Sequence, residues 1–312
     1  MKVLITGATG LIGSEIVKLS HERGIDVHYL TTSKNKISDK DNYRGFYWDP
    51  EKEQIDVSCL EGVDAIINLA GASVAKRWTG PYKEKIRSSR IQSVRTLREA
   101  IDQSKNHNIK SFVSASAIGI YPDSLTEYYE VDEKRIDDSF LGRLTSEWEA
   151  AVDELSGSDI SVAKVRVGLV LSSDGGALSQ MVKPIKYYAG AVFGNGEQWQ
   201  SWIHIRDLAE IFLYITEKKM TGVFNGVAPN PVTHEKLIKE IASQLNRPLF
   251  LPNIPRSMLK LVLGEMSSLL FSSQRVSCKR LENFGFHFQY PNIKGALENI
   301  LSEEKELNYK PL

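Results

Sequence analysis

The sequence predicts an α/β fold, in which a doubly wound parallel sheet is followed by a smaller C-terminal substrate lobe. Apolar runs typical of buried strands alternate with amphipathic helical segments through residue 171. This alternation indicates a parallel sheet that is covered on both faces. Beyond residue 172 the pattern loosens. We therefore expect a first domain over residues 1–171, to which residues 202–227 return, and a smaller lobe over 172–201 and 228–312.

A glycine-rich turn joins the first strand to the first helix. Residues 3–5 are apolar, Gly7, Gly10 and Gly13 follow at three-residue spacing, and residues 14–20 have helical periodicity. In such turns the glycines permit a tight bend, a close approach of phosphate and close packing of the helix on the strand. A loop without a ligand is the alternative, but the flanking strand and helix favour a dinucleotide whose pyrophosphate lies on the helix N-terminus. The residues expected to contact it are Gly7, Thr9, Gly10, Leu11, Ile12 and Gly13.

Residues 26–30 predict the second strand, and the residues that follow indicate which dinucleotide binds. An acidic residue at this point of the fold binds the adenosine ribose hydroxyls and selects NAD. Here Thr32, Ser33 and Lys34 follow the strand, and no carboxylate occurs before Asp39. Because hydroxyls and an ammonium can receive a 2′-phosphate, we predict NADP. NAD is the alternative, in which Lys34 is a solvated loop lysine.

The later elements continue the alternation. We expect strands at 46–50, 63–71, 110–116, 160–171 and 223–227, and helices at 82–104, at 140–155 and from an N-capping Thr233 to Leu245. Ligands of parallel sheets lie beyond the carboxyl ends of the strands. Because small residues at the end of the 63–71 strand suit a backbone that passes close to a cofactor, we expect contacts from Leu69, Ala70 and Gly71.

Composition excludes several function classes. Lysine plus arginine equals aspartate plus glutamate, 39 each, so no basic excess attracts nucleic acid or an anionic membrane. Cys59 and Cys278 show no metal-ligand spacing and suit a reducing compartment, so we predict no metal site. The N-terminal apolar run is too short for a signal peptide, and residues 258–271 are too short to span a bilayer. We therefore expect a cytoplasmic protein, and the sequence leaves a homodimer open.

Several motifs together resemble the uncharacterised "epimerase family" branch of the atypical, extended-like short-chain dehydrogenase/reductase superfamily. Besides the glycine turn they are NLAGA (68–72), SRI (89–91), SASAIGIY (114–121), WE (148–149), VGLVL (167–171), GGAL (175–178), SWIH (201–204) and GFHF (285–288). The last resembles a short C-terminal domain of unknown function found in that branch. The resemblance implies a Rossmann domain, an NAD(P) cofactor and a C-terminal substrate lobe. It implies no particular reaction.

Members of the wider superfamily use Ser to orient the substrate oxygen, and Tyr with a neighbouring Lys to transfer a proton. Ser116 matches that Ser by resemblance. Aligning Glu149 with the acidic residue that commonly ends the helix motif puts Leu141 at the Tyr position and Thr145 at the Lys position. Neither side chain can move protons as Tyr and Lys do, so these two positions do not support the usual mechanism.

Chemistry at this site must then recruit other groups. Tyr121, five residues after Ser116, can donate or accept a proton. Arg90, where the resemblance usually has a helix Asn, can hold an anionic substrate group or steady the Ser116 end of the site. We therefore predict Ser116, Tyr121 and Arg90 as the catalytic residues.

Two functions fit these observations. The first is an NADP(H)-binding oxidoreductase or nucleotide-sugar epimerase-like enzyme that acts on an unidentified small polar substrate. The second is a cofactor-bound regulatory or interaction protein with little or no catalysis, for example one related to cell division. The glycine turn and Ser116 favour the first function, whereas Leu141 and Thr145 favour the second.

Overall fold

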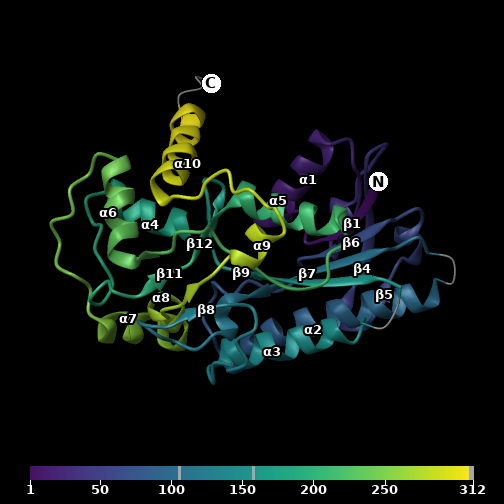
Figure 1. Cartoon of the computed structure of the whole chain (residues 1–312), viewed down its shortest axis with the longest axis horizontal. Helices are drawn as coiled ribbons and strands as arrows, with labels where there is room; N and C mark the ends of the chain where they lie inside the picture. The colour runs from purple at the N-terminus through teal and green to yellow at the C-terminus, as the bar shows by residue number, and fades with distance from the viewer. Residues whose placement is uncertain (105–106, 157–158, 309–312) are drawn as a thin grey trace. The chain divides into compact units, whose positions relative to one another are not determined.

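A computed structural model describes residues 1–104, 107–156 and 159–308, and Figure 1 shows the arrangement of the elements. The chain divides into two compact units. The sheet unit comprises Met1–Ile120, Asp138–Arg166 and Ala209–Phe224. The second unit comprises Tyr121–Asp137, Val167–Leu208 and Asn225–Leu312. The chain therefore leaves the sheet unit at Tyr121, at Val167 and at Asn225, and it re-enters at Asp138 and at Ala209.

The sheet unit is built on strands that, among the described residues, pair in the order β13-β9-β7-β6-β1-β2-β4-β3, with β5 paired to β4. Because β1 pairs in parallel with both β2 and β6, the strand order reverses at β1, which is where open α/β sheets bind their ligands. The doubly wound fold is thereby confirmed, and so is the return of the strand predicted at 223–227. The strands are β1 (Lys2–Thr6), β2 (Asp26–Thr31), β3 (Asp39–Lys40), β4 (Tyr43–Asp49), β5 (Gln54–Ile55), β6 (Ala65–Asn68), β7 (Ser111–Ala117), β9 (Ser161–Val167) and β13 (Gly222–Gly226).

Helices cover both faces of this sheet. In Figure 1 one face carries α2 (Gly80–Gln103) and α3 (Phe140–Asp153), and the other carries α1 (Leu11–Glu22) and α5 (Ile205–Glu217). Strands that are buried on both faces are near-continuous apolar runs. The middle of β1 shows this, because Val3, Leu4 and Ile5 are all fully buried.

Our prediction of a single strand over residues 160–171 is wrong. β9 ends at Val167, and β10 (Leu169–Ser172) pairs instead with β12 (Trp202–His204) in the second unit. The break falls at Gly168, where a Cβ would lie 2.2 Å from the carbonyl oxygen of Ser201. Only glycine allows this close approach of two backbones, and the contact comes from a distant segment that the local pattern does not reveal.

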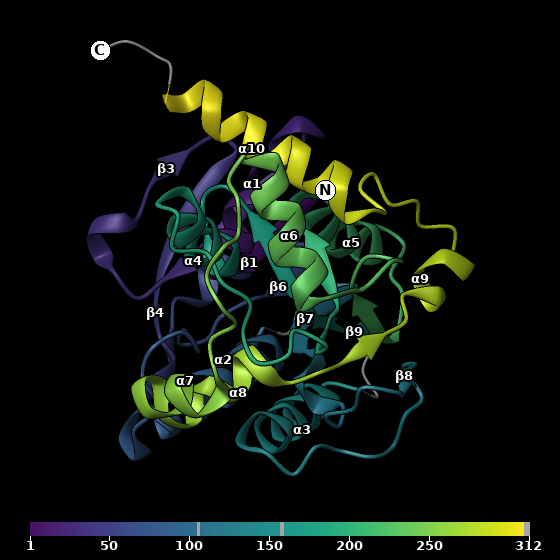
Figure 2. The ribbon, with the colours of Figure 1, turned by 90° about the vertical axis from the view of Figure 1, so that its left-hand side faces the viewer.

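The second unit consists of short strand pairs and helices. Thr233 caps α6 as predicted, since its hydroxyl accepts a hydrogen bond from the Lys236 backbone N–H. α10 packs against α6, as Figure 2 shows. Besides β10 and β12, the elements are β8 (Tyr128–Tyr129), α4 (Gly176–Lys186), β11 (Trp199–Gln200), β14 (Val232–Thr233), α6 (His234–Gln244), α7 (Arg256–Leu263), α8 (Ser268–Phe271), β15 (Arg275–Val276), α9 (Lys279–Asn283) and α10 (Ile293–Asn308).

Two buried histidines of the second unit are held neutral. The backbone N–H of Arg206 donates to His204 Nδ1 at 3.1 Å, so the proton of the neutral ring is on Nε2, which donates to Asn299 Oδ1 at 3.1 Å. His234 is buried with its ring stacked on Phe193, at 4.9 Å between ring centroids. Burial lowers the pKa of each of these rings to about 4.

We expect the protein to lose stability on mild acidification because of these rings. The unfolded chain binds their protons near the ordinary pKa of 6.5, whereas the folded chain resists protonation down to about 4, so stability falls as the pH drops through this window. The loss reaches roughly 2 kcal/mol per ring at about pH 5. Urea unfolding near neutrality and near pH 5 measures it. His234→Phe keeps an aromatic ring that cannot titrate and should reduce this pH dependence; a pH dependence equal to that of the unmodified protein contradicts the explanation.

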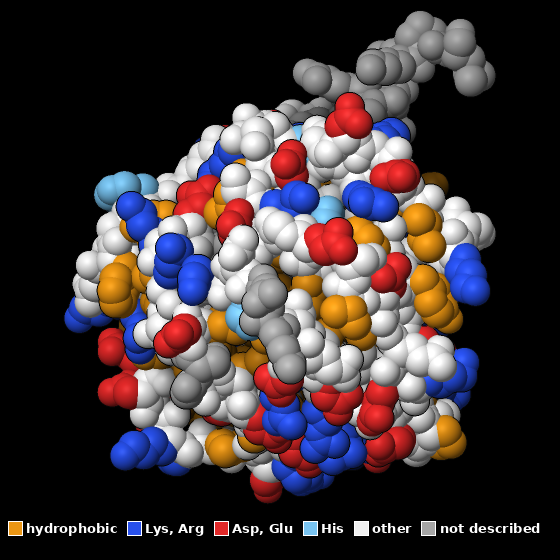
Figure 3. Space-filling model, turned by 90° about the vertical axis from the view of Figure 1, so that its right-hand side faces the viewer, with side chains coloured by type: hydrophobic (Ala, Val, Ile, Leu, Met, Phe, Trp, Pro, Cys, Tyr) orange, Lys and Arg blue, Asp and Glu red, His pale blue; other side chains and the backbone are white. Residues whose placement is uncertain are grey.

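The surface carries charges of both signs. Figure 3 shows one face on which basic and acidic side chains are interspersed and hydrophobic side chains form separate areas. This distribution agrees with the formal net charge of +0. Within the described ranges, no helix combines the length and the apolar character that crossing a bilayer requires.

Candidate functional site

The glycine turn lies between the end of β1 and the start of α1. Gly7 has a φ of +68°, a left-handed conformation that favours glycine, and the Gly10 N–H donates to its carbonyl at 2.9 Å. Gly13 packs directly on this turn: a Cβ there would lie 2.2 Å from Gly7 O and 2.7 Å from Ala8 Cα. The amides of the first turn of α1 are thereby held at the end of the sheet, next to the point where the strand order reverses. This cradle fits a phosphate group.

Side chains link three neighbouring strands here, at the carboxyl ends of β1 and β6 and in the middle of β7. Thr6 Oγ1 donates to Asn68 Oδ1 at 2.8 Å, and Asn68 Nδ2 donates to Ser114 Oγ at 3.1 Å. Thr6 Oγ1 also accepts from the backbone N–H groups of Leu69 and Ala70, at 2.9 and 3.0 Å. The buried Thr6 hydroxyl therefore holds the predicted cofactor segment after β6 beside the glycine turn. Sequence reasoning missed Thr6, although a hydroxyl residue directly before the first glycine was a visible signal.

The residues predicted to read the 2′-phosphate follow β2, the neighbour of β1. Thr32 and Lys34 are exposed and Ser33 is half-buried. The Ser33 backbone N–H donates to Thr31 Oγ1 at 3.2 Å, which turns the chain into a short 3₁₀ segment over Lys34–Lys36. Lys34 Nζ lies 5.1 Å from the centre of the Tyr47 ring, so an aromatic face orients the ammonium. Two hydroxyls and one cation thus lie at this strand end.

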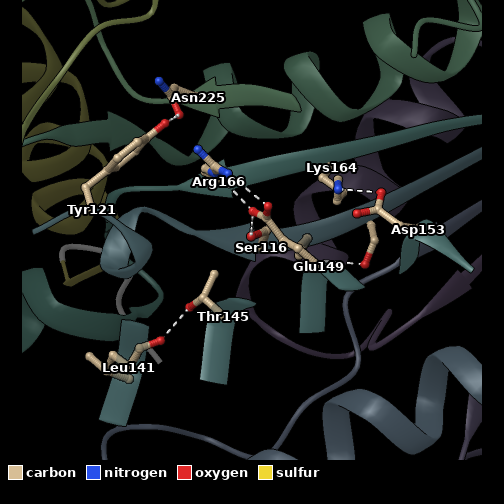
Figure 4. Close-up of polar contacts among 11 residues, drawn as sticks. Ser116, Tyr121, Leu141, Thr145, Glu149, Asp153, Lys164, Arg166 and Asn225 are labelled. Atoms are coloured by element: carbon tan, nitrogen blue, oxygen red, sulfur yellow. Dashed lines mark hydrogen bonds and ion pairs between the residues drawn. The ribbon is translucent and has the colours of Figure 1, made fainter. Parts of the chain in front are cut away.

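Ser116 lies in a buried charge cluster rather than alone at a strand end. In Figure 4, Ser116 of β7, Glu149 of α3 and Arg166 of β9 point toward one another. Ser116 Oγ donates to Glu149 Oε1 at 2.5 Å. Arg166 donates through Nε to Glu149 Oε1 at 2.8 Å and through Nη2 to Oε2 at 2.9 Å. All three residues are less than 9% exposed.

This cluster keeps the Glu149 carboxylate ionised. Burial raises the pKa of Glu149, but the hydrogen bonds and charge of Arg166 and the hydrogen bond from Ser116 outweigh burial, so the pKa lies below its ordinary value. An ionised carboxylate only accepts hydrogen bonds. The single hydrogen of the Ser116 hydroxyl is therefore directed at Glu149, and its oxygen is left as an acceptor. Sequence reasoning used Glu149 only to align the helix and missed Arg166, although each is a charge directly after a large apolar residue, Trp148 and Val165.

Leu141 and Thr145 lie one turn apart on α3. The buried Thr145 hydroxyl donates to the Leu141 carbonyl oxygen at 2.8 Å, a bond within the helix that Figure 4 also shows. The Leu141 side chain lies against Gly119, where a Cβ would be 3.4 Å from Leu141 Cβ. Neither side chain offers a group that titrates.

Tyr121 belongs to the core of the second unit. It is fully buried, its hydroxyl donates to Asn225 Oδ1 at 2.7 Å, and its ring stacks on Tyr129 at 5.2 Å between centroids. Asn225 Nδ2 in turn donates to the Ser277 carbonyl at 2.9 Å. This network would have to open before Tyr121 could transfer a proton, so its catalytic role stays a prediction.

Arg90 lies on α2. Its guanidinium carbon is 5.2 Å from the centre of the Trp148 ring, and a Cβ on Gly71 would approach that carbon to 3.0 Å. The structure therefore brings Arg90 to the end of β6, beside the predicted cofactor segment. Across the three described ranges, no group of three or more His, Cys, Asp or Glu side chains could hold a metal ion.

Comparison with known proteins covers nearly the whole chain. Residues 3–226 match the NAD dependent epimerase/dehydratase family, and residues 254–300 match the domain of unknown function DUF1731. "Epimerase family protein SAR0825" of Staphylococcus aureus is 35% identical over 305 residues, which cover 96% of this chain and 99% of that protein. The chloroplastic "epimerase family protein SDR39U1 homolog" of Arabidopsis thaliana is 35% identical over 306 residues, which cover 96% of this chain and 87% of that protein.

Solved structures show the same fold. The crystal structure of the human epimerase family protein SDR39U1 (isoform2) with NADPH superposes with a TM-score of 0.86 and 29% identity, over 97% of this chain and 99% of that one. A nucleoside-diphosphate sugar epimerase from Corynebacterium glutamicum superposes with a TM-score of 0.77 and 28% identity, over 100% of this chain and 62% of that one.

Proposed function

Because the chain belongs to the NAD dependent epimerase/dehydratase family and carries a DUF1731 domain at its C-terminal end, we propose that it is an NADP(H)-dependent oxidoreductase or epimerase-like enzyme acting on a small polar substrate. The observation that carries the proposal is the glycine turn, in which Gly13 lets α1 pack directly on the turn, so that the N–H groups of its first turn lie at the reversal point of the sheet. When bound, the nicotinamide supplies hydride transfer.

The choice of NADP over NAD rests on the residues after β2. Thr32, Ser33 and Lys34 offer hydrogen-bond donors and a positive charge where an NAD-specific site has a carboxylate. The related human protein, whose structure contains NADPH, supports this choice.

Ser116 sets a constraint on the chemistry. Its hydrogen is directed at the ionised Glu149, so Ser116 offers a substrate only lone pairs. Such an oxygen accepts a hydrogen bond from a substrate hydroxyl and cannot polarise a carbonyl without first leaving Glu149. With Leu141 and Thr145 at the positions of the usual proton-transfer pair, we infer that this site binds an alcohol better than a carbonyl.

Lys34→Ala tests the cofactor assignment. We expect the Kd for NADPH to rise about tenfold, the usual effect of losing one charge-assisted hydrogen bond, and the Kd for NADH to stay unchanged. Titration of protein fluorescence with each dinucleotide gives both constants. The control is Lys36→Ala, an exposed lysine of the same 3₁₀ segment. Equal losses for NADPH and NADH would contradict a 2′-phosphate site at Lys34, and failure of the unmodified protein to bind either one would contradict the proposed function.

A cofactor-bound regulatory protein is the second candidate. It is favoured by the Thr145 hydroxyl, which donates within its own helix where the superfamily has a proton-transfer lysine. Turnover separates the two candidates. Protein saturated with NADPH or NADP is mixed with a panel of carbonyl compounds, alcohols and nucleotide sugars, and the change in NADPH absorbance is followed. Any substrate-dependent change favours the enzyme, and none across the panel favours the regulatory protein.

A further inference from the structure

One side of the Arg90 guanidinium, formed by the Nε–H and Nη2–H groups, is available to bind a ligand. Nη1 donates to the backbone oxygens of Ala72 and Ile86, at 3.1 and 2.9 Å. For the Nε–H and Nη2–H groups, the structure shows no acceptor within the described residues. These two groups form the side of the guanidinium that binds a carboxylate or phosphate through two parallel hydrogen bonds. The residue is half-buried, so this side is both partly desolvated and reachable.

The charge of Arg90 also lacks a counterion. Within the described parts of the chain, no carboxylate lies at ion-pair distance from it, whereas Arg87, one turn earlier on α2, pairs with Glu84 and Glu147. Burial lowers the pKa of Arg90 to about 10, so the group is still protonated at neutral pH. A partly buried cation without an anion is costly, and binding an anion would remove much of that cost.

The surroundings of Arg90 hold it in place. The Trp148 ring stacks on the guanidinium, and Nη1 is fixed by two backbone carbonyls, so little conformational freedom remains to be lost on binding. Trp148 lies nearly one turn after Thr145 on α3. A cation from α2 is thus held against Trp148, on the helix that carries the lysine in the superfamily.

We assign the phosphate groups of the proposed cofactor to sites other than Arg90. The pyrophosphate fits the turn after β1, and the 2′-phosphate fits the residues after β2. Arg90 lies at the end of β6, on the other side of β1 and toward β7, which carries Ser116. An anion bound to Arg90 would therefore come from the substrate.

We propose that Arg90 binds a carboxylate or phosphate group of the substrate through its Nε–H and Nη2–H groups. The proposal rests on the proposed function and narrows it, since the substrate would carry an anionic group in addition to the alcohol that the Ser116 oxygen favours. Arg90 then sets which substrates bind, and the Trp148 ring and the two backbone carbonyls keep its orientation.

Chemical labelling of the unmodified protein tests this without a known substrate. Phenylglyoxal reacts with accessible guanidinium groups, and mass spectrometry of peptides gives the labelling rate of each arginine. The probes are inorganic phosphate and succinate, added to protein saturated with NADPH. We expect either probe to slow the labelling of Arg90, by about tenfold at ten times its Kd. The labelling rate of Arg87, on the same helix, should not change.

A matched pair of variants adds a binding measurement. Arg90→Lys keeps the charge but loses the two parallel donors, and we expect calorimetric binding of phosphate to the NADPH complex to weaken about tenfold or more. Arg87→Lys should bind phosphate as the unmodified protein does. If Arg90→Lys fails to fold, the labelling experiment still decides.

The outcomes separate this proposal from the cofactor assignment. If NADPH binds but neither probe protects Arg90, the anion site is overturned and the proposed function stands. If NADPH alone protects Arg90 and the probes add nothing, Arg90 belongs to the cofactor site and the proposal is overturned. If NADPH does not bind at all, the proposed function fails, while protection by phosphate in its absence would still support an anion site.

Discussion

Replacing Gly13 with valine is expected to abolish measurable binding of NADPH. Already the first added carbon, Cβ, would lie 2.2 Å from Gly7 O and 2.7 Å from Ala8 Cα. Both are backbone atoms, so no change of rotamer relieves the clash, and α1 must move away from the turn. That movement displaces the N–H groups that we assign to the pyrophosphate. Overpacking of this kind also costs about 1–3 kcal/mol of stability.

The measurement must separate lost binding from lost folding. Circular dichroism and urea unfolding report the fold, and fluorescence titration reports the Kd for NADPH. Gly13→Ala is the milder variant and should weaken binding strongly while the fold remains. Gly80→Ala is the control, because Gly80 lies in the first turn of α2 and a Cβ there would meet nothing within 4 Å. If folded Gly13→Ala binds NADPH as tightly as Gly80→Ala does, the turn after β1 is not the pyrophosphate site.

Local patterns in the sequence were enough for the first strand, turn and helix of the sheet unit. The apolar run before Gly7 and the periodic segment after Gly13 are adjacent, so the strand, turn and helix could be predicted together. The cap at Thr233 is local as well, since its hydroxyl accepts from a residue three positions later. Burial on both faces makes the parallel strands continuous apolar runs, which are the strongest signal of an α/β fold.

Contacts between distant segments could not be predicted. The close approach of Ser201 to Gly168 ends β9, and nothing near Gly168 in the sequence indicates it. Ser116 was predicted from a motif, but its partner Glu149 is 33 positions away, so the direction of its hydrogen bond was hidden. Arg90 was predicted to hold an anionic substrate group or to steady the Ser116 end of the site, yet only the structure shows that Nη1 is occupied and that the guanidinium lies over the Trp148 ring.

Replacing Glu149 with glutamine is expected to cost about 3–5 kcal/mol of stability, the usual result of removing one partner of a buried ion pair. Gln fills nearly the same volume, so the loss reflects charge and hydrogen bonding rather than a cavity. The amide cannot offer Arg166 two acceptor oxygens, and its NH₂ group would face a cation. Urea unfolding near neutral pH, where Glu149 is ionised, measures the change.

Glu147→Gln is the matched control, on the same helix two residues earlier. Glu147 is exposed and pairs with the exposed Arg87, and pairs of this kind contribute about 1 kcal/mol or less. If both variants lose the same small amount, the Ser116–Glu149–Arg166 cluster does not stabilise the sheet unit as its burial implies. A large loss for Glu149→Gln alone would show that the Ser116 hydroxyl is held by a carboxylate that the fold depends on. Ser116 could then serve a substrate only as an acceptor, because turning its hydrogen away would weaken the bond that keeps this buried charge in place.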